Sequence, residues 1–329
     1  MEMEIASRYV TLVLPVSEEA HVDGARRAVM REAKLLIDDE TVLGRITLVA
    51  QEAARNLVVH AGHGELHVSY DEWYFDLLAV DTGPGMSNVA QCLTDHFSTR
   101  GTLGAGLGAI KRLSDRFDIH SQPGKGTVVL ARFELRTPPR LELVAGAVCT
   151  PYPGEELAGD AWAVKGNRVM LCDGLGHGLA AHMVSTRARD LFLAHDLRMP
   201  LADFMGQAHR ALSNTRGGAM AVAEVLPQTG QLNFCGIGNI AGLLVADRAR
   251  GLVSSNGTIG YKAGRIQSYT YPWDDTSLLI MSSDGITSRC TPDAYPGLVH
   301  RHPAVIAAAL HRDYKRLNDD ATLLVFKHA

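Results

Sequence analysis

The chain has 329 residues, a length that suits two domains of ordinary size better than one core. Hydrophobic residues make up 46% of it and charged residues 21%, a balance that excludes disordered, fibrous and disulfide-built chains. With 32 basic and 36 acidic residues the net charge is only -4, so we predict neither a nucleic-acid nor a membrane partner.

The N-terminus and the cysteines indicate the compartment. The chain starts with MEMEIASRYV, which carries acids where a secretion signal carries bases, and no apolar run approaches the roughly 20 residues that span a bilayer. The five cysteines are far apart and form no CxxC pair, which is typical of reduced thiols rather than of disulfides or a zinc site. The expected location is the cytoplasm.

The first part of the chain mixes strand and helix patterns in the way that is typical of a layered α/β domain. Gly62 is expected to end the second helix, and a Gly-rich loop precedes the third. In chain order we expect a strand at 9–14, helices to about residue 37 and at 41–60, strands at 65–70 and 73–80, a helix at 107–115 and two strands near 117–133.

Two consecutive prolines, Pro138 and Pro139, mark the most distinct break, because proline removes a backbone donor and biases its neighbours away from helix. We therefore expect one domain at 1–137 and a second at 138–329. The second has strands, then helices, then strands again, an order that predicts a sandwich. Its expected elements are strands at 144–149, 161–164 and 169–172, helices at 179–194 and 201–214, and further strands up to residue 326.

On the second predicted helix, Glu52 and Asn56 lie four residues apart and therefore share one face. This spacing suits a catalytic base beside a metal ligand, although a solvated Glu and an unrelated Asn would give the same pattern. The next strand ends in DTGPG, where an acid is followed by glycines that permit close ligand approach. A further segment, GTLGAGLG, opens a helix whose amide groups could hold a phosphate chain, or forms a flexible turn.

The order of these motifs, with GKGT at 124–127 after them, resembles the ATP site of the gyrase, chaperone and histidine-kinase ATPase superfamily. Residues 40–133 are most similar to anti-sigma-factor serine kinases, including the stressosome switch kinase, through ARNLVVHAG, DTGPG and FSTRGTLGAGLGAIKRL. The resemblance implies a two-layer α/β sandwich that binds ATP and Mg²⁺.

The same resemblance implies a role for each site residue. Asn56 would hold Mg²⁺ against the phosphates, Glu52 would activate the acceptor serine, and Asp81 would read the adenine amino group. Some relatives place an arginine directly before the last Gly block, whereas here the nearest, Arg100, lies outside it, and its role stays open. The other implied nucleotide-binding positions are Gly83 and Gly85 in the pocket, Gly104, Gly106 and Gly108 at the phosphates, and Thr127 near the base.

In the second half, acidic residues stand at the apparent ends of strands. Carboxylates suit Mg²⁺ or Mn²⁺, and two such ions could orient a water molecule and hold a phosphoryl group. Ordinary Asp-Gly turns would look the same one at a time. These acids are Asp160, Asp173, Asp284 and the pair Asp319 and Asp320.

The sequences around these acids resemble the metal-dependent PPM-type protein phosphatases in their SpoIIE-like branch, over residues 146–326. The matching segments are LAGDAWAV, LCDGLGHGLAA, GIGNI, LLIMSSDGITSR and NDDATLLVF. The resemblance implies a four-layer αββα sandwich that holds two metal ions, bridged by the catalytic Asp173. The other implied ligands are Asp160 and the Gly174 carbonyl on one ion, and Asp284 and Asp319 on the other.

Three further residues near these segments have open roles. Asp320 is expected to support the ligands, because in the family Thr, here Thr322, stands three residues after the liganding acid. His177 could position a group but is better explained as a solvated turn histidine, and Asn239 could shape the site or cap a turn. No arginine matches the phosphate-binding residue of larger relatives.

Together the two resemblances imply a bifunctional enzyme of a bacterial partner-switching pathway. It would phosphorylate and dephosphorylate a serine or threonine of an anti-sigma-antagonist (STAS-type) partner or a stressosome scaffold protein. Two alternatives stay open: a phosphatase regulated by a non-catalytic ATP-binding domain, and an ATP-sensing module that sequesters a partner.

Overall fold

The chain forms two compact units, which are described separately. The computed structural model describes residues 6–7, 10–93, 106–137 and 140–329. The N-terminal unit consists of Val10–Pro139 and Pro292–Arg312, and the C-terminal unit of Met1–Tyr9, Arg140–Thr291 and Asp313–Ala329.

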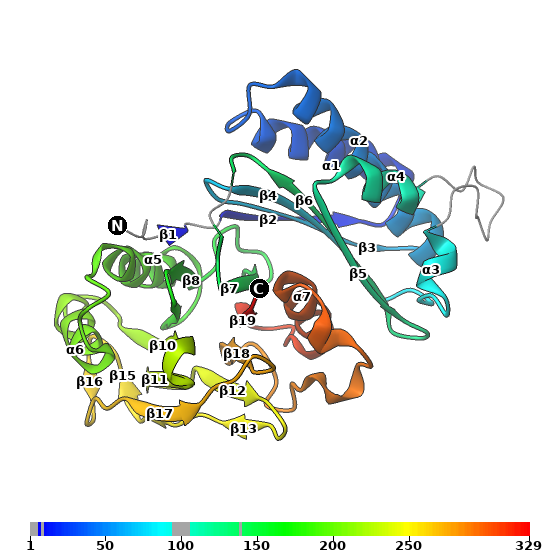
Figure 1. Ribbon diagram of the computed structural model, residues 1–329. Helices are drawn as coiled ribbons and strands as arrows, with labels where there is room; N and C mark the ends of the chain where they lie inside the picture. The colour runs from blue at the N-terminus through cyan, green and yellow to red at the C-terminus, as the bar shows by residue number, and fades with distance from the viewer. Residues whose placement is uncertain (1–5, 8–9, 94–105, 138–139) are drawn as a thin grey trace. The chain divides into compact units, whose positions relative to one another are not determined.

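The N-terminal unit is a two-layer α/β sandwich, as the sequence predicted (Figure 1). Its five-stranded antiparallel sheet has the order β2-β3-β4-β6-β5. Helices α1, α2 and α4 pack on one face of this sheet and share one hydrophobic core with it. The elements are β2 (Val10–Val16), α1 (Glu19–Ala33), α2 (Glu40–Asn56), β3 (Gly64–Tyr70), β4 (Tyr74–Asp81), α3 (Val89–Cys92), α4 (Gly106–Leu113), β5 (Arg116–Gln122) and β6 (Gly126–Glu134).

Helix α2 positions the first predicted site, and its limits follow from local chemistry. The Asp39 side chain caps its start by accepting hydrogen bonds from the amides of Thr41 and Val42, at 2.7 and 3.3 Å. A π-helical turn, Leu57–Ala61, follows Asn56, and Gly62 ends it with a φ of 86°. The predicted stop at Gly62 is therefore confirmed.

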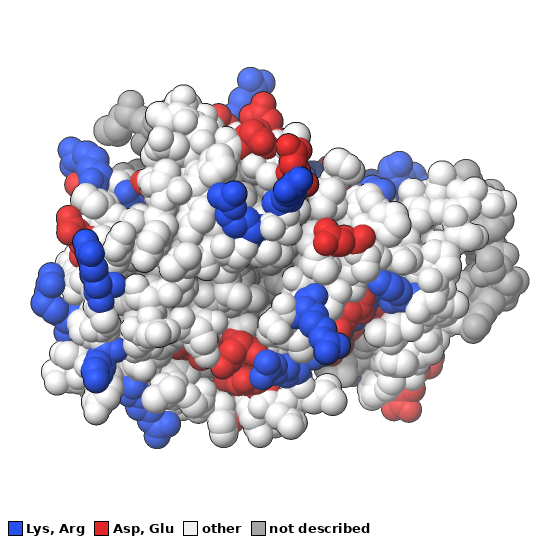
Figure 2. Space-filling model, turned by 90° about the horizontal axis from the view of Figure 1, so that it is seen from below, with Lys and Arg blue, Asp and Glu red and all other residues white. Residues whose placement is uncertain are grey.

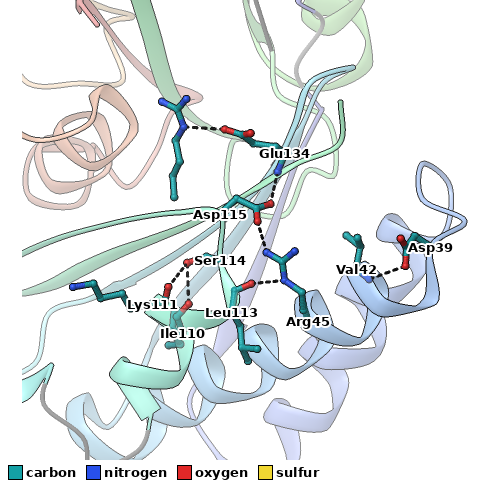
Figure 3. Close-up of polar contacts among 10 residues, drawn as sticks. Asp39, Val42, Arg45, Ile110, Lys111, Leu113, Ser114, Asp115 and Glu134 are labelled. Carbon is teal, nitrogen blue, oxygen red and sulfur yellow. Dashed lines mark hydrogen bonds and ion pairs between the residues drawn. The ribbon is translucent and has the colours of Figure 1, made fainter. Parts of the chain in front are cut away.

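A salt bridge ties α2 to the end of α4 (Figure 3). Arg45 of α2 donates from Nε to the Leu113 carbonyl at 2.7 Å and pairs with the Asp115 carboxylate. Asp115 in turn accepts from the backbone amide of Glu134 on β6, at 2.9 Å. The two helices that carry predicted ATP-site residues are thereby held to each other and to the sheet.

The C-terminal unit has two sheets, antiparallel apart from the parallel pair β11 and β14, that pack face to face around a core of buried apolar residues. The first has the order β1-β8-β9-β10-β11-β14, with β17 paired to β11, and the second β13-β12-β18-β19-β7. Helices α5 and α6 cover the other face of the first sheet. The mixed α/β class predicted from the sequence is confirmed.

The strands of this unit include short ones that extend the two sheets or form the hairpin β15-β16. Several of these short strands were not expected from the sequence. The elements are β1 (Ala6–Ser7), β7 (Leu143–Thr150), β8 (Asp160–Lys165), β9 (Arg168–Gly174), α5 (Gly178–Ala194), α6 (Leu201–Ala211), β10 (Gly218–Leu226), β11 (Gln231–Ile237), β12 (Ala241–Val245), β13 (Arg250–Gly251), β14 (Ser254–Ser255), β15 (Gly257–Thr258), β16 (Lys262–Ala263), β17 (Tyr269–Pro272), β18 (Leu278–Ser282) and β19 (Ala321–His328).

One helix, α7 (Pro303–Tyr314), was missed by the sequence analysis, which expected only strands after residue 214. Its residues 303–311 are all buried, and the sequence PAVIAAALH has no polar stripe that would reveal a helical period. The unit boundary crosses α7 after Arg312. The domain limits at 1–137 and 138–329 stay a prediction, and the segment Pro292–Arg312 adds a part of the second half to the N-terminal unit.

The surface has charges of both signs. On the face shown in Figure 2, Lys and Arg side chains are interspersed with Asp and Glu and with uncharged areas. Among the described helices, none is long and apolar enough to cross a membrane.

The buried ion pair between Asp76 and Arg132 gives a prediction about stability. These residues face each other on β4 and β6, with two hydrogen bonds of 2.7 Å, and each side chain is 8% exposed. Asp76→Ala removes the carboxylate from a buried guanidinium, so we expect it to destabilise the sheet by about 3–5 kcal/mol. Asp23→Ala, which breaks an exposed pair with Arg26, should cost under about 1 kcal/mol.

The measurement is hydrogen exchange of the β4 and β6 amides, because a chain of two units need not unfold in one step. Equal protection in both variants would contradict the stabilising role of the ion pair.

Candidate active sites

The structure brings Glu52, Asn56 and the start of α4 together. A Cβ atom on Gly106 would lie 3.1 Å from Asn56 Oδ1 and 3.4 Å from Glu52 Oε2. Glycine at this position therefore keeps open the space between α4 and these two side chains. Asn56 Nδ2 is buried and has no hydrogen-bond partner among the described residues, so it could donate to a ligand oxygen.

The Gly-rich segment is described only in part. Gly106 and Gly108 open α4, whose first amide groups have no partner within the helix and can donate to an anion. Gly104 and Arg100 lie outside the described residues. The described part of the segment thus fits the predicted phosphate site, which stays a prediction.

Asp81, at the end of β4, connects the DTGPG motif, in which it is the first residue, with the GKGT motif. Its Oδ1 accepts hydrogen bonds from the amides of Gly83, at 2.8 Å, and Thr127, at 3.1 Å. Burial raises the pKa of Asp81, and these two hydrogen bonds oppose the rise. The carboxylate is held in one orientation, with Oδ2 left for a ligand donor such as an adenine amino group.

Backbone approaches in this pocket are too close for side chains. A Cβ on Gly126 would lie 2.1 Å from the Asp81 carbonyl oxygen, and one on Gly85 would lie 2.2 Å from the Gln122 carbonyl oxygen. Both glycines also have positive φ values, 94° and 68°. Gly126 is thus required by packing between the two motifs, and Gly85 by the close approach of the Gln122 backbone.

In the C-terminal unit, four of the predicted acids come from the ends of strands in both sheets. Asp160 and Asp173 face each other on β8 and β9, whereas Asp284 follows β18 and Asp319 precedes β19. Burial raises the pKa of Asp173, and the charges of Asp160, Asp284 and Asp319 raise it further. The charges of the other three carboxylates thus act on Asp173, while the roles of these four acids as metal ligands stay a prediction.

A serine that the sequence analysis overlooked links the two sheets at this point. Ser283 Oγ donates to Asp160 Oδ2 at 2.7 Å and accepts from the amide of Thr322 at 2.9 Å. Ser283 is 1% exposed, and it is separated from Asp160 by 123 positions along the chain. Its place directly before Asp284 was a weak signal, because only the packing of the sheets shows which carboxylate it meets.

The acidic residues fit a divalent cation in their chemistry. Asp160 Oδ1 and Asp320 Oδ2 are buried and have no hydrogen-bond partner in the described chain, which is unfavourable for an anionic oxygen without a cation. Among the described residues, no group of three or more His, Cys, Asp or Glu side chains is placed so that it could hold a metal ion. The assignment of metal ligands therefore stays a prediction. It is supported by the two buried oxygens without a partner and by the mutual repulsion of the carboxylates around Asp173.

The structure shows the contacts of the three residues whose roles the sequence left open. Asn239 Nδ2 donates to Asp284 Oδ2 at 2.7 Å, so Asn239 orients that carboxylate. Asp320 Oδ1 accepts from the Tyr152 amide at 2.9 Å. His177 is half exposed at the start of α5, bonds to Glu155 at 3.0 Å and stacks on Tyr152, in keeping with a turn histidine.

Comparisons with known proteins agree with the two motif sets. The model of the family described as Stage II sporulation protein E (SpoIIE) matches residues 164–329, about half of the chain. The chain belongs to the SpoIIE family. The model described as Histidine kinase-like ATPase domain matches residues 15–133 of this SpoIIE-family chain. Both resemblances found in the sequence are therefore confirmed.

Two curated relatives match parts of this SpoIIE-family chain. The serine/threonine-protein kinase RsbT of Bacillus subtilis (strain 168) is 38% identical over 91 residues, which are 26% of this chain and 68% of that protein. The anti-sigma F factor of Halalkalibacterium halodurans is 28% identical over 99 residues, 27% of this chain and 68% of that protein.

A solved structure shows a similar fold. It is described as "The bacterial stressosome: a modular system that has been adapted to control secondary messenger signaling". Its chain superposes with a TM-score of 0.51 at 22% identity, covering 56% of this chain and 99% of its own length. At this identity the similarity concerns the fold alone.

The two hairpin glycines of GKGT allow a matched test of the nucleotide pocket. Gly126→Ala places a Cβ against the Asp81 carbonyl, so we expect it to lower the affinity for a fluorescent ATP analogue by tenfold or more, about 1.4 kcal/mol. Gly124 also has a positive φ, 76°, but a Cβ atom at this position would meet no described atom within 4 Å, so Gly124→Ala serves as the matched control. The Gly124→Ala variant should lose about 1–2 kcal/mol of stability through left-handed backbone strain and should retain its affinity for the ATP analogue. Equal affinities of the two variants would refute the packing argument.

The Ser283 contact allows a test of the acidic site. Ser283→Ala removes the donor that orients Asp160, and groups that orient metal ligands typically change metal affinity about 10–100-fold. We expect a weakening of this size in calorimetric titrations with Mn²⁺. Ser288→Ala, at an exposed position of the same segment, serves as the control. Unchanged Mn²⁺ affinity in Ser283→Ala would show that Asp160 is not held in this way for a cation.

Proposed function

We propose that this chain is a protein serine/threonine kinase and a metal-dependent protein serine/threonine phosphatase that act on the same partner. The observation that supports the proposal best is the placement of Glu52 and Asn56 directly against the start of α4. This arrangement puts a base next to the helix end that would hold the ATP phosphates. The same chain contains a SpoIIE-type unit with a cluster of acidic residues.

In the proposed kinase reaction, a serine or threonine hydroxyl attacks the γ-phosphorus of ATP, the bond to ADP breaks, and Glu52 accepts the hydroxyl proton. Asp81 would hold the adenine, because its Oδ1 is already fixed by the amides of Gly83 and Thr127. Mg²⁺ at Asn56 would neutralise the phosphate charge. Phosphate transfer then depends on orientation by residues that come from α2, α4 and β4.

In the proposed phosphatase reaction, water attacks the phosphoserine phosphorus, the bond from phosphorus to the serine oxygen breaks, and that oxygen takes up a proton released by the water to leave as the serine hydroxyl. Two Mg²⁺ or Mn²⁺ ions, when bound, would supply the charge that activates this water. Asp173, Asp160, Asp284, Asp319 and the Gly174 carbonyl would be their ligands. Ser283 and Asn239 each hold one carboxylate in place, so the site is supported from both sheets.

The proposed substrate is a serine or threonine on a small anti-sigma-antagonist (STAS-type) domain or a stressosome scaffold protein. It rests on the similarity to the kinase RsbT and to the anti-sigma F factor. Two other functions are consistent with the fold: a phosphatase with a non-catalytic ATP domain, and a nucleotide sensor that only sequesters a partner. The presence of both Glu52 and Asn56 beside α4 favours the bifunctional enzyme.

Complementary variants test the proposal. An Asp173→Asn chain keeps the kinase site, so with labelled ATP it should phosphorylate a candidate STAS-type domain, and the product should accumulate. An Asn56→Ala chain should then remove that phosphate and should not transfer it. Glu52→Ala should bind ATP normally but turn over about 10²–10⁴-fold more slowly, because a base acts on the transition state.

Each rival function predicts a different outcome. No transfer by the Asp173→Asn chain, with ATP binding intact, would support the non-catalytic ATP domain. Chelator-resistant removal of phosphate by the Asn56→Ala chain would contradict the metal-dependent phosphatase. If the Asn56→Ala chain removed phosphate only from other phosphoproteins, the two activities would not share a substrate.

A further inference from the structure

A segment from the second half of the chain is part of the N-terminal unit. Pro292–Arg312 lies within the residues that match the SpoIIE family, and yet its contacts group it with Val10–Pro139. It contains two short 3-10 turns and most of α7. It makes polar contacts with β5, with the hairpin of the GKGT motif and with Asp81 at the end of β4.

The first part of this segment is fixed to β5. The amide of His302 donates to Asp118 Oδ2 at 2.6 Å, and Arg301 Nη1 donates to Asp118 Oδ1 at 3.3 Å. Asp118 therefore caps the start of α7 with one oxygen and pairs with a cation through the other. A carboxylate that accepts at a helix start also interacts favourably with the helix dipole.

A second contact involves the hairpin of the GKGT motif. Lys125 Nζ lies 4.0 Å from the centre of the Tyr295 ring and donates to the Ala294 carbonyl at 3.3 Å. The His120 ring lies 6.4 Å from the same tyrosine ring. The segment thus packs on the residue directly before Gly126, whose position decides the shape of the pocket around Asp81.

The third contact reaches Asp81 itself. Arg312 Nη1 donates to the Asp81 carbonyl oxygen at 2.9 Å, the same oxygen against which Gly126 packs. The carboxylate of Asp81 is the group expected to read adenine. Arg312 also lowers the pKa of Asp81 against the larger effect of burial, which favours the ionised form that accepts a hydrogen bond.

We propose that Pro292–Arg312 completes the nucleotide pocket of the N-terminal unit, in which Arg312 is a positioning residue that holds the Asp81 peptide for the nucleotide. The proposal deepens the proposed function and rests on it. The two states are α7 attached to or released from the Asp81 carbonyl. Nucleotide that orders Asp81 favours the attached state, and by linkage attachment of α7 strengthens nucleotide binding.

The experiment uses the full chain and a fluorescent ADP analogue. Arg312→Ala should weaken binding of the analogue about tenfold, the size expected for one lost hydrogen bond from a charged group. In the unsubstituted chain, the analogue should increase hydrogen-exchange protection of residues 303–312. This response should be lost in Arg312→Ala and retained in Arg248→Ala, at an exposed arginine between β12 and β13.

Arg312→Lys provides a second variant if Arg312→Ala does not fold, and it should show an intermediate weakening. Unaltered affinity and an unaltered protection change in the Arg312 variants would overturn the proposal, as would equal protection of 303–312 with and without analogue. In those cases the analogue still binds, so the proposed kinase and phosphatase reactions remain standing. Absence of binding to the unsubstituted chain would overturn both.

Discussion

A carboxylate that is removed from water needs hydrogen-bond donors or a cation, and both candidate sites are organised by this requirement. Asp81 receives two backbone amides, and it can do so because the turn that follows β4 and the start of β6 meet at glycines. Asp160 receives a serine hydroxyl on one oxygen and has no described partner on the other. The Asp81 carboxylate is thus held by two donors through one oxygen before ligand arrives, whereas Asp160 still offers a buried oxygen without a described partner.

The two sites also differ in where their rigidity comes from. In the N-terminal unit it comes from helices that are attached to each other, since Arg45 joins α2 to the end of α4. In the C-terminal unit it comes from two sheets, because Ser283 joins the end of β18 to Asp160 on β8.

The sequence analysis failed at α7 for a physical reason. Amphipathic periodicity reveals a helix only when one side faces water, and the buried run at 303–311 has no such side. Short motifs separated by glycines were predicted well, since each needs only local chemistry. The contacts of Ser283, Asp118 and Arg312 could not be predicted, because each partner lies more than 100 positions away.

The sequence by itself determined the two families, the layered α/β architecture and the acidic, glycine-rich segments, because these depend on residue types at short spacing. It also determined that Glu52 and Asn56 share a helix face, since four residues make about one helical turn. Only the tertiary structure decided that Pro292–Arg312 joins the N-terminal unit and that Arg312 meets the Asp81 carbonyl. The physical reason is that such contacts are selected by the packing of whole surfaces, which no local pattern records.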